Sequence, residues 1–364
     1  MNKHSTNVKN ISGGGRQSNF ELLRIVCMIG IIASHYVTQS DAIEITTGAN
    51  LLICLLANIG GKFGVNCFVI ITSWFLVDKV QNFKSVLLTW FTVFVYQLSV
   101  SILSYVFGIG DSSLFVIAKS ALPVLGNLNW YVSAYFVFIM LIPFVKIMLY
   151  NLSRLQFITL FITLTIANVI GPYIFEIQDF TTSPLFFIYI FIAVYGVKKY
   201  DFLKLKVNTS TFVIVSCIFF MIIMQYVYRV YHVEHSIVFN STAMYSPFQI
   251  LLSAAVFTIF KNLNIKNNKL INSIAKHTFS VFVIHTVYPI RYNFLWKNLL
   301  HVQNWYYSKY FLLHLIVSVV AIYICCLIVD AFVTKLVFKP VSNNSYFLKF
   351  ANYIHSRFYI QIDR

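Results

Sequence analysis

Long apolar runs separated by short polar stretches dominate the chain. A helix needs about 20 mostly apolar residues to cross the hydrocarbon core of a bilayer. Windows of this kind cover residues 20–38, 61–77, 85–107, 129–149, 155–174, 184–200, 211–230, 243–262, 271–290 and 311–334. The runs are continuously apolar and do not alternate, which favours helices over a membrane barrel. The pattern predicts an all-α integral membrane protein with about ten transmembrane helices.

Two further segments, 49–59 and 114–126, are too short or too interrupted by Gly and Pro to span, and we interpret them as interfacial or re-entrant. Ten crossings place both termini on the same side. The predicted organisation is a flexible N-terminal arm over 1–18, a transmembrane domain over 19–339 and a tail over 340–364. This tail is basic and aromatic, which favours a position along the inner leaflet.

Composition and charge agree with a membrane protein. Of the 364 residues, 59% are hydrophobic and 10% are charged, whereas charged residues make up about a quarter of a soluble domain. The formal net charge of +16 would suggest nucleic acid in a soluble protein. With a cytoplasmic N-terminus, however, all but six of the 27 Lys and Arg residues fall in cytoplasmic segments, as the positive-inside rule requires. The charge therefore indicates orientation in a plasma membrane, with the anionic lipid bilayer as partner and no nucleic acid.

The six basic residues on the outer side of this topology are exceptions to the rule. They are Lys62, Lys119, Arg229, Arg291, Lys297 and Lys309, and three of them crowd the last outer loop. The six cysteines all lie in apolar segments without Cys-x-x-Cys spacing, so we predict neither disulfides nor a metal site.

Ionisable side chains within a bilayer are costly, so each is a candidate for function. The first span carries Glu21, Arg24 and His35. Eleven residues separate Arg24 from His35, which places them about 20° apart around a helix and about 16 Å apart along it. Glu21, one turn before Arg24, can pair with it. One face of the helix thus joins a cation at the inner surface to an imidazole within the membrane.

Such a face suits a phosphorylated pantetheine thioester, whose phosphates and reactive carbonyl lie at opposite ends of a long arm. Arginine binds phosphate in a bidentate manner, and a neutral histidine can take the proton of an attacking hydroxyl. A structural alternative stays open, in which Arg24 snorkels to the interface and His35 bonds to another helix.

Other polar and aromatic side chains fall at comparable depth. Asn66 and Ser73 share one face of the second span, and His285 lies in the outer half of the ninth. Trp130, Tyr131 and Tyr135 open the fourth span. These three aromatics are either interface anchors or part of a site, and His285 is either a bond between helices or a site residue.

The order of these motifs resembles the acyltransferase-3 family, the multi-spanning bacterial enzymes that O-acylate cell-surface carbohydrates. Glu21-Leu-Leu-Arg24 followed by His35 is similar to its first-helix signature, and Gly64-Val-Asn66 through Ser73 to Leu76 is similar to its second. Asn129-Trp130-Tyr131 through Tyr135 to Pro143 resembles its Trp-Tyr block, and Ser280 to His285 resembles its late Ile-His segment.

This resemblance implies a transmembrane acyltransferase domain that transfers an acyl group, commonly acetyl from cytoplasmic acetyl-CoA, to a hydroxyl of a polysaccharide or its lipid-linked precursor. It implies that His35 is catalytic, with His285 beside it, and that Arg24 contacts acyl-CoA with help from Lys84. Glu21, Asn66, Ser73, Trp130, Tyr131 and Tyr135 would surround them.

The chain also departs from the family pattern. Lys84 stands alone where members often have two arginines, and Asn66 and Trp74 replace an Asp and a Gly. Asn66 can still orient a histidine but cannot stabilise an imidazolium by charge. A component that exports a polysaccharide or lipid-linked sugar is the alternative function, since ten spans and many aromatics fit it equally well. The acceptor sugar, the acyl group and the oligomeric state do not follow from the sequence.

Overall fold

The computed structural model describes residues 16–79, 82–177, 182–202, 205–232, 238 and 240–358, and within these it contains helices and loops but no strand. The all-α prediction is confirmed. Residues 1–15 of the predicted arm lie outside the described residues, and the first helix begins at Ser18.

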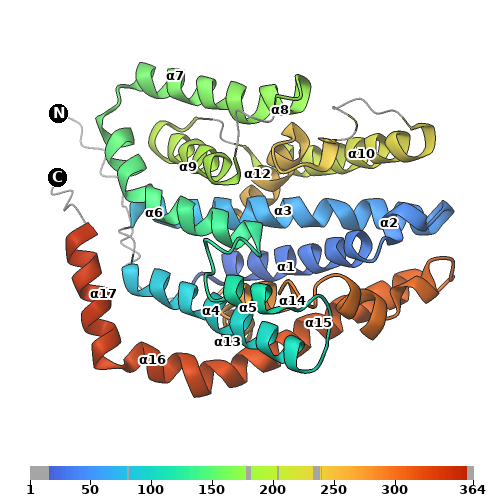
Figure 1. Ribbon diagram of the computed structural model, residues 1–364. Coiled ribbons are helices and arrows are strands. Elements are labelled where there is room, and N and C mark those ends of the chain that lie inside the picture. The colour runs from blue at the N-terminus through green and yellow to red at the C-terminus, as the bar shows by residue number, and fades with distance from the viewer. Residues whose placement is uncertain are drawn as a thin grey trace, which may run out of the picture.

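Helices follow one another through short connections. The α-helices are α1 (Ser18–Gln39), α2 (Ala42–Ile45), α3 (Gly48–Asp78), α4 (Phe83–Val106), α5 (Leu114–Ser120), α6 (Trp130–Asn151), α7 (Arg154–Thr165), α8 (Gly171–Ile174), α9 (Ser183–Tyr200), α10 (Val207–Tyr231), α12 (Pro247–Asn262), α13 (Lys269–Ala275), α14 (Thr278–His285), α15 (Phe311–Val333), α16 (Lys339–Asn343) and α17 (Ser345–Phe358). Short π segments, η1 (Ile166–Ile170), η4 (Asn293–Leu299) and η6 (Thr334–Phe338), and 3₁₀ turns, η3 (Asn240–Thr242) and η5 (Val302–Trp305), complete the described secondary structure. In Figure 1, α1 and α3 run through the middle, with α7 and α8 at the top and α16 below.

Eight helical stretches within the described residues are long and apolar enough to cross a membrane. They are Ser18–Gln39, Gly48–Asp78, Phe83–Val106, Trp130–Asn151, Arg154–Ile174, Val207–Tyr231, Asn240–Asn262 and Phe311–Asn343. The helix α9 matches the predicted span 184–200, but it has 18 residues and carries Lys198 and Lys199 in its last turn. The chain is thus a multi-pass membrane protein, while the count of ten and the cytoplasmic placement of both termini remain predictions.

Two of the predicted segments were wrong. Residues 49–59 are not a separate interfacial segment, because α3 is one helix of 31 residues that includes them. The predicted span 271–290 is not continuous, because a turn at Lys276 and His277 divides it into α13 and α14, and the helix ends at His285. Gly60 and Gly61 do not end the helix, and at the turn between α13 and α14 the ring of His277 bonds to Asp330 of α15.

The glycines of α3 bring it into close contact with α1. A Cβ atom on Gly60 would lie 2.6 Å from the carbonyl oxygen of Gly30, and one on Gly64 would lie 2.8 Å from that of Cys27. Small residues four apart allow two membrane helices to approach at the backbone. The pairing of Gly60 with Gly30 and of Gly64 with Cys27 also shows that the two helices are antiparallel. The end of α3 therefore lies beside the start of α1, where the rings of Phe20 and Phe75 are 5.3 Å apart.

The outer surface of the bundle is apolar, as a lipid environment requires. On α10, Phe212, Val215 and Phe219 are all exposed. On α15, Ile316, Val320 and Ile324 are likewise exposed. These residues follow helical spacing, so each helix turns an apolar stripe outward. The helix α17 is different, since its exposed Tyr346, Phe350 and Tyr353 alternate with polar residues. That pattern is typical of a helix lying at a membrane surface.

Candidate functional site

Two histidines from distant parts of the sequence meet inside the bundle. His35, near the end of α1, and His285, the last residue of α14, have Nδ1 and Nε2 atoms 3.1 Å apart. Their ring centroids are 5.3 Å apart. His285 is 2% exposed, and His35 is partly buried. Since 250 residues separate them in sequence, only the folded bundle creates this pair.

A second hydrogen bond fixes the direction of the pair. Nδ1 of His285 lies 2.6 Å from the carbonyl oxygen of Val281. A carbonyl only accepts, so Nδ1 of His285 donates, and in a neutral ring Nε2 must then accept. It accepts from Nδ1 of His35, so Nε2 of His35 carries a lone pair, which has no hydrogen-bond partner among the described residues. This is the arrangement that a general base needs.

A cavity of about 500 Å³ adjoins His35. Most of the residues that line it are polar, and they come from α1, α3, the start of α6, η3 and the segment after α14. Its lining is Ile31, Ser34, His35, Thr38, Gln39, Asn58, Gly61, Lys62, Val65, Asn129, Trp130, Asn240, Thr242, Ala243, Phe282, Thr286, Arg291 and Tyr292. Trp130 and Tyr292 are 39% and 42% exposed, so the cavity reaches the surface. A small polar molecule or the end of a larger one can therefore approach His35.

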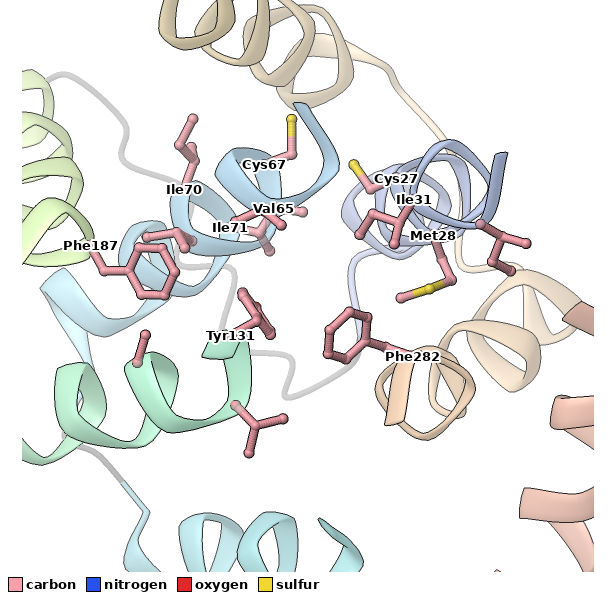
Figure 2. Close-up of a cluster of buried hydrophobic side chains, with 14 of the residues drawn as sticks. Cys27, Met28, Ile31, Val65, Cys67, Ile70, Ile71, Tyr131, Phe187 and Phe282 are labelled. Carbon is pink, nitrogen blue, oxygen red and sulfur yellow. The ribbon is translucent and has the colours of Figure 1, made fainter. Parts of the chain in front are cut away.

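The floor of this cavity is the hydrophobic core. Ile31, Val65 and Phe282 line the cavity and also belong to the main cluster of buried apolar residues. In Figure 2, Tyr131 from α6 and Phe282 from α14 point toward α1 and α3, and their rings are 5.1 Å apart. The polar space around His35 is thereby separated from the opposite end of the bundle by packed apolar side chains.

Arg24 lies at that opposite end. Its Nη1 donates to Oε1 of Glu21 at 2.6 Å, which confirms the pairing that the sequence predicted. Met28 and Ile31 occupy the positions between Arg24 and His35 on the same helical face, and both are almost completely buried. Lys84 opens α4 shortly after the end of α3, so it belongs to the Arg24 end. Neither Arg24 nor Lys84 lines the His35 cavity.

A family model described as an acyltransferase domain, acyltransferase-3, matches residues 17–330. The chain belongs to the acyltransferase-3 family. No curated protein and no solved structure shows a detectable match to it. Membership identifies the class of protein, a membrane acyltransferase, while the roles of individual residues rest on the geometry described above and below.

In this acyltransferase-3 chain, Asn66 and Ser73 contribute differently from the prediction. Asn66 is fully buried, but its Nδ2 donates to the carbonyl oxygen of Met244 at 2.9 Å and does not contact a histidine. The side chain that contacts His35 is that of His285. Within the described residues, Oδ1 of Asn66 and Oγ of Ser73 are buried and form no hydrogen bond.

The three aromatics of α6 divide between surface and core. Trp130 is at the mouth of the cavity, where Nζ of Lys62 lies 4.2 Å from its ring centroid. Tyr131 is 6% exposed and packs in the core, with Tyr135 stacked on it at 5.9 Å between centroids. Interface anchoring therefore does not describe Tyr131, although it remains open for Trp130.

Sequence reasoning missed two cations of the cavity. Lys62 and Arg291 were noted only as exceptions to the positive-inside rule, yet both line the cavity with His35. Their unfavourable position in the topology was the available signal, since a cation on the outer side of a membrane protein needs a reason to be there.

A buried polar cluster was also missed. His277, Asp330 and Tyr96 come from the turn before α14, from α15 and from α4, and all three are at most 5% exposed. Asp330 accepts hydrogen bonds from Nδ1 of His277 and, at 2.6 Å, from the hydroxyl of Tyr96. None of the three lines the His35 cavity. Asp330 lies near the end of the predicted span 311–334, where a side chain could reach solvent, but tertiary packing buries it.

Proposed function

We propose that the protein transfers an acyl group, acetyl in the first instance, from cytoplasmic acyl-CoA to a hydroxyl of a cell-surface polysaccharide or its lipid-linked precursor. The bacterial plasma membrane is the proposed location. The observation that carries this proposal is the free Nε2 of His35 beside a polar cavity, with its tautomer fixed by His285. Family membership supports acyl transfer as the reaction.

In the proposed reaction, the acceptor hydroxyl occupies the cavity and gives its proton to Nε2 of His35. Its oxygen bonds to the thioester carbonyl carbon, and collapse of the tetrahedral intermediate breaks the carbon–sulfur bond. The coenzyme A sulfur leaves and takes the proton from His35, which returns to its neutral form. General base catalysis of this kind contributes about 10²-fold to 10⁴-fold. His285 acts as a positioning residue, since it holds the His35 ring but is not required to touch the reacting atoms.

The donor is proposed to enter from the end of the bundle that carries Arg24 and Lys84. The guanidinium of Arg24 has five N–H donors, and its described bond to Glu21 uses one of them. The remaining donors can contact the phosphates of coenzyme A. About 16 Å of helix separates Arg24 from His35, and an extended pantetheine arm would have to pass Met28 and Ile31 to reach the base.

The test is turnover of labelled acetyl-CoA by the purified protein in nanodiscs, with a saccharide acceptor in solution, and movement of the sugar is measured in parallel with the protein in lipid vesicles. We expect His35→Ala to lower transfer by about 10²-fold or more while the amount of folded protein stays the same. His301→Asn is the matched control. His301 is exposed and has a positive φ of 48°, which Asn tolerates.

Three outcomes separate the competing interpretations. Transfer that persists in His35→Ala would show that the base is elsewhere. An acyl group trapped on His35 itself would mean that the imidazole carries the acyl group instead of acting as a base. No turnover of acetyl-CoA, together with sugar movement across the vesicle membrane, would support the export function and contradict the enzyme.

A further inference from the structure

Two basic side chains share the cavity with His35. Lys62 comes from the middle of α3, and Arg291 comes from the segment that follows α14. No Asp or Glu is among the residues that line the cavity. With neutral histidines, the lining therefore carries two positive charges and no negative charge.

Within the described residues, the two cations contact aromatic rings and a backbone carbonyl but no carboxylate. Among the described residues, no carboxylate forms an ion pair with Lys62 or Arg291, whereas Arg229 binds Glu44 and Lys297 binds Asp41. Arg291 donates from Nη1 to the carbonyl oxygen of Leu128 at 2.8 Å, and its Nε is buried without a described partner. Unpaired cations in a partly buried site are costly, and an anionic ligand would offset that cost.

We propose that Lys62 and Arg291 form an anion subsite of the His35 cavity, and that the acceptor is a saccharide that carries a carboxylate or a phosphate. This inference rests on the proposed function for the identity of the ligand as acceptor. The donor is a less suitable occupant, because coenzyme A phosphates are assigned to Arg24, on the far side of the core layer formed by Ile31, Val65 and Phe282.

The rest of the lining suits a sugar. Amides and hydroxyls surround the space. Two of them are bonded to each other, since Nδ2 of Asn129 donates to Oγ1 of Thr286 at 2.8 Å. Trp130 and Tyr292 present aromatic rings at the mouth. A site with a few placed polar groups, exposed aromatic faces and two cations fits an acidic sugar unit or a sugar next to a phosphate.

The experiment measures binding separately from transfer. Purified full-length protein in nanodiscs of zwitterionic lipid is titrated at low ionic strength, so that charge interactions are not screened. The probes are a glucuronate tetrasaccharide, inorganic pyrophosphate and neutral cellotetraose. We expect at least one anionic probe to bind about tenfold more tightly than cellotetraose. Tighter binding of the glucuronate would identify the anionic group of the acceptor as a sugar carboxylate, and tighter binding of pyrophosphate would identify it as a lipid-linked phosphate.

Variants assign that binding to the two cations. We expect the double variant Lys62→Gln, Arg291→Gln to bind the anionic probe about 10-fold to 100-fold more weakly, because hydrogen bonds to charged groups contribute strongly to affinity. Lys62→Arg and Arg291→Lys retain the charges and should retain most of the binding. The control is Lys309→Gln, which removes an exposed cation outside the cavity and should change nothing.

Several results would overturn the inference. They are equal binding of acidic and neutral probes, no binding of either anion, or full binding by the double variant. Displacement of the probe by phosphatidylglycerol in the nanodisc would assign the cations to lipid, and an equal loss of coenzyme A binding would assign them to the donor. His35→Ala should still bind the anion. A His35→Ala protein that retains both transfer and anion binding would contradict the proposed function alone.

Discussion

Two histidine clusters lie at the two ends of α14 and have different partners. His277 lies just before the first residue of the helix. Its ring and the hydroxyl of Tyr96 both donate to the carboxylate of Asp330. None of these three residues lines the His35 cavity. The hydrogen-bond partners of His285 within the described residues are a backbone carbonyl and another imidazole, and that imidazole lines the cavity.

The two clusters differ in how completely their hydrogen-bonding atoms are satisfied within the protein. Asp330 accepts from two donors on two other segments, so it links α4, α14 and α15 and its hydrogen-bonding capacity is largely satisfied inside the protein. The His35 pair has one lone pair, on Nε2 of His35, without a hydrogen-bond partner among the described residues, and His35 lines the cavity. A buried polar cluster that is satisfied internally stabilises the fold, whereas one that leaves a reactive atom on a cavity is available for chemistry.

Replacing Asp330 should have the largest effect on stability. Asp330→Ala leaves His277 and Tyr96 buried without their acceptor, and removing one member of a buried pair costs about 3 to 5 kcal/mol. We expect a large fall in the free energy of unfolding, measured by thermal or detergent denaturation, with little change in transfer rate per folded molecule.

Asp41→Asn is the control for Asp330. Asp41 is paired with Lys297 at 2.6 Å, but half of its side chain is exposed, so the loss should be within about 1 kcal/mol. If Asp330→Ala lowered transfer while the protein kept its stability, the cluster would belong to the reaction and the contrast with His35 would fail.

Replacing His285 should affect activity more than stability. His285→Ala removes the acceptor for Nδ1 of His35, so the ring can rotate or change tautomer, and loss of such an orienting partner costs about 10-fold to 100-fold. His285→Gln offers an amide oxygen in a similar place and should recover part of the rate. Steady-state kinetics should show the loss in kcat, with little change in the KM for acetyl-CoA.

The two variants of His285 also test whether its role is merely structural. A destabilised but otherwise normal enzyme would show less folded protein and an unchanged kcat in both. Equal kcat losses in Ala and Gln would contradict an orienting hydrogen bond.

The sequence allowed parts of this comparison to be predicted. The pair of Glu21 and Arg24 was predictable because both residues lie on one helix with fixed geometry. His35 and His285 were each identified as candidates, but the contact between them requires the packing of α1 against α14. The burial of Asp330 could not be predicted, because a position near the end of a helix does not reveal that neighbouring helices cover it.

Local rules also misled where tertiary contacts override them. The segment 49–59 was predicted to be separate from the span 61–77, yet Gly60 between them packs on the backbone of Gly30 and the helix continues. The opposite occurred at residues 271–290, where hydropathy is continuous but the helix breaks at His277. Hydropathy reports membrane depth and not hydrogen-bond partners, so the break could not be predicted from it.

The smallest effect should come from Tyr96. Tyr96→Phe keeps the ring in the core and removes only the hydroxyl that donates to Asp330 at 2.6 Å. The carboxylate keeps its bond to His277, so the loss should be about 1 to 2 kcal/mol of unfolding free energy, well below that of Asp330→Ala. Transfer by the folded protein should be unchanged. If Tyr96→Phe cost as much stability as Asp330→Ala, the hydroxyl and not His277 would be the main partner of the carboxylate, and the cluster would have to be regarded as a tyrosine–aspartate pair with a histidine at its edge.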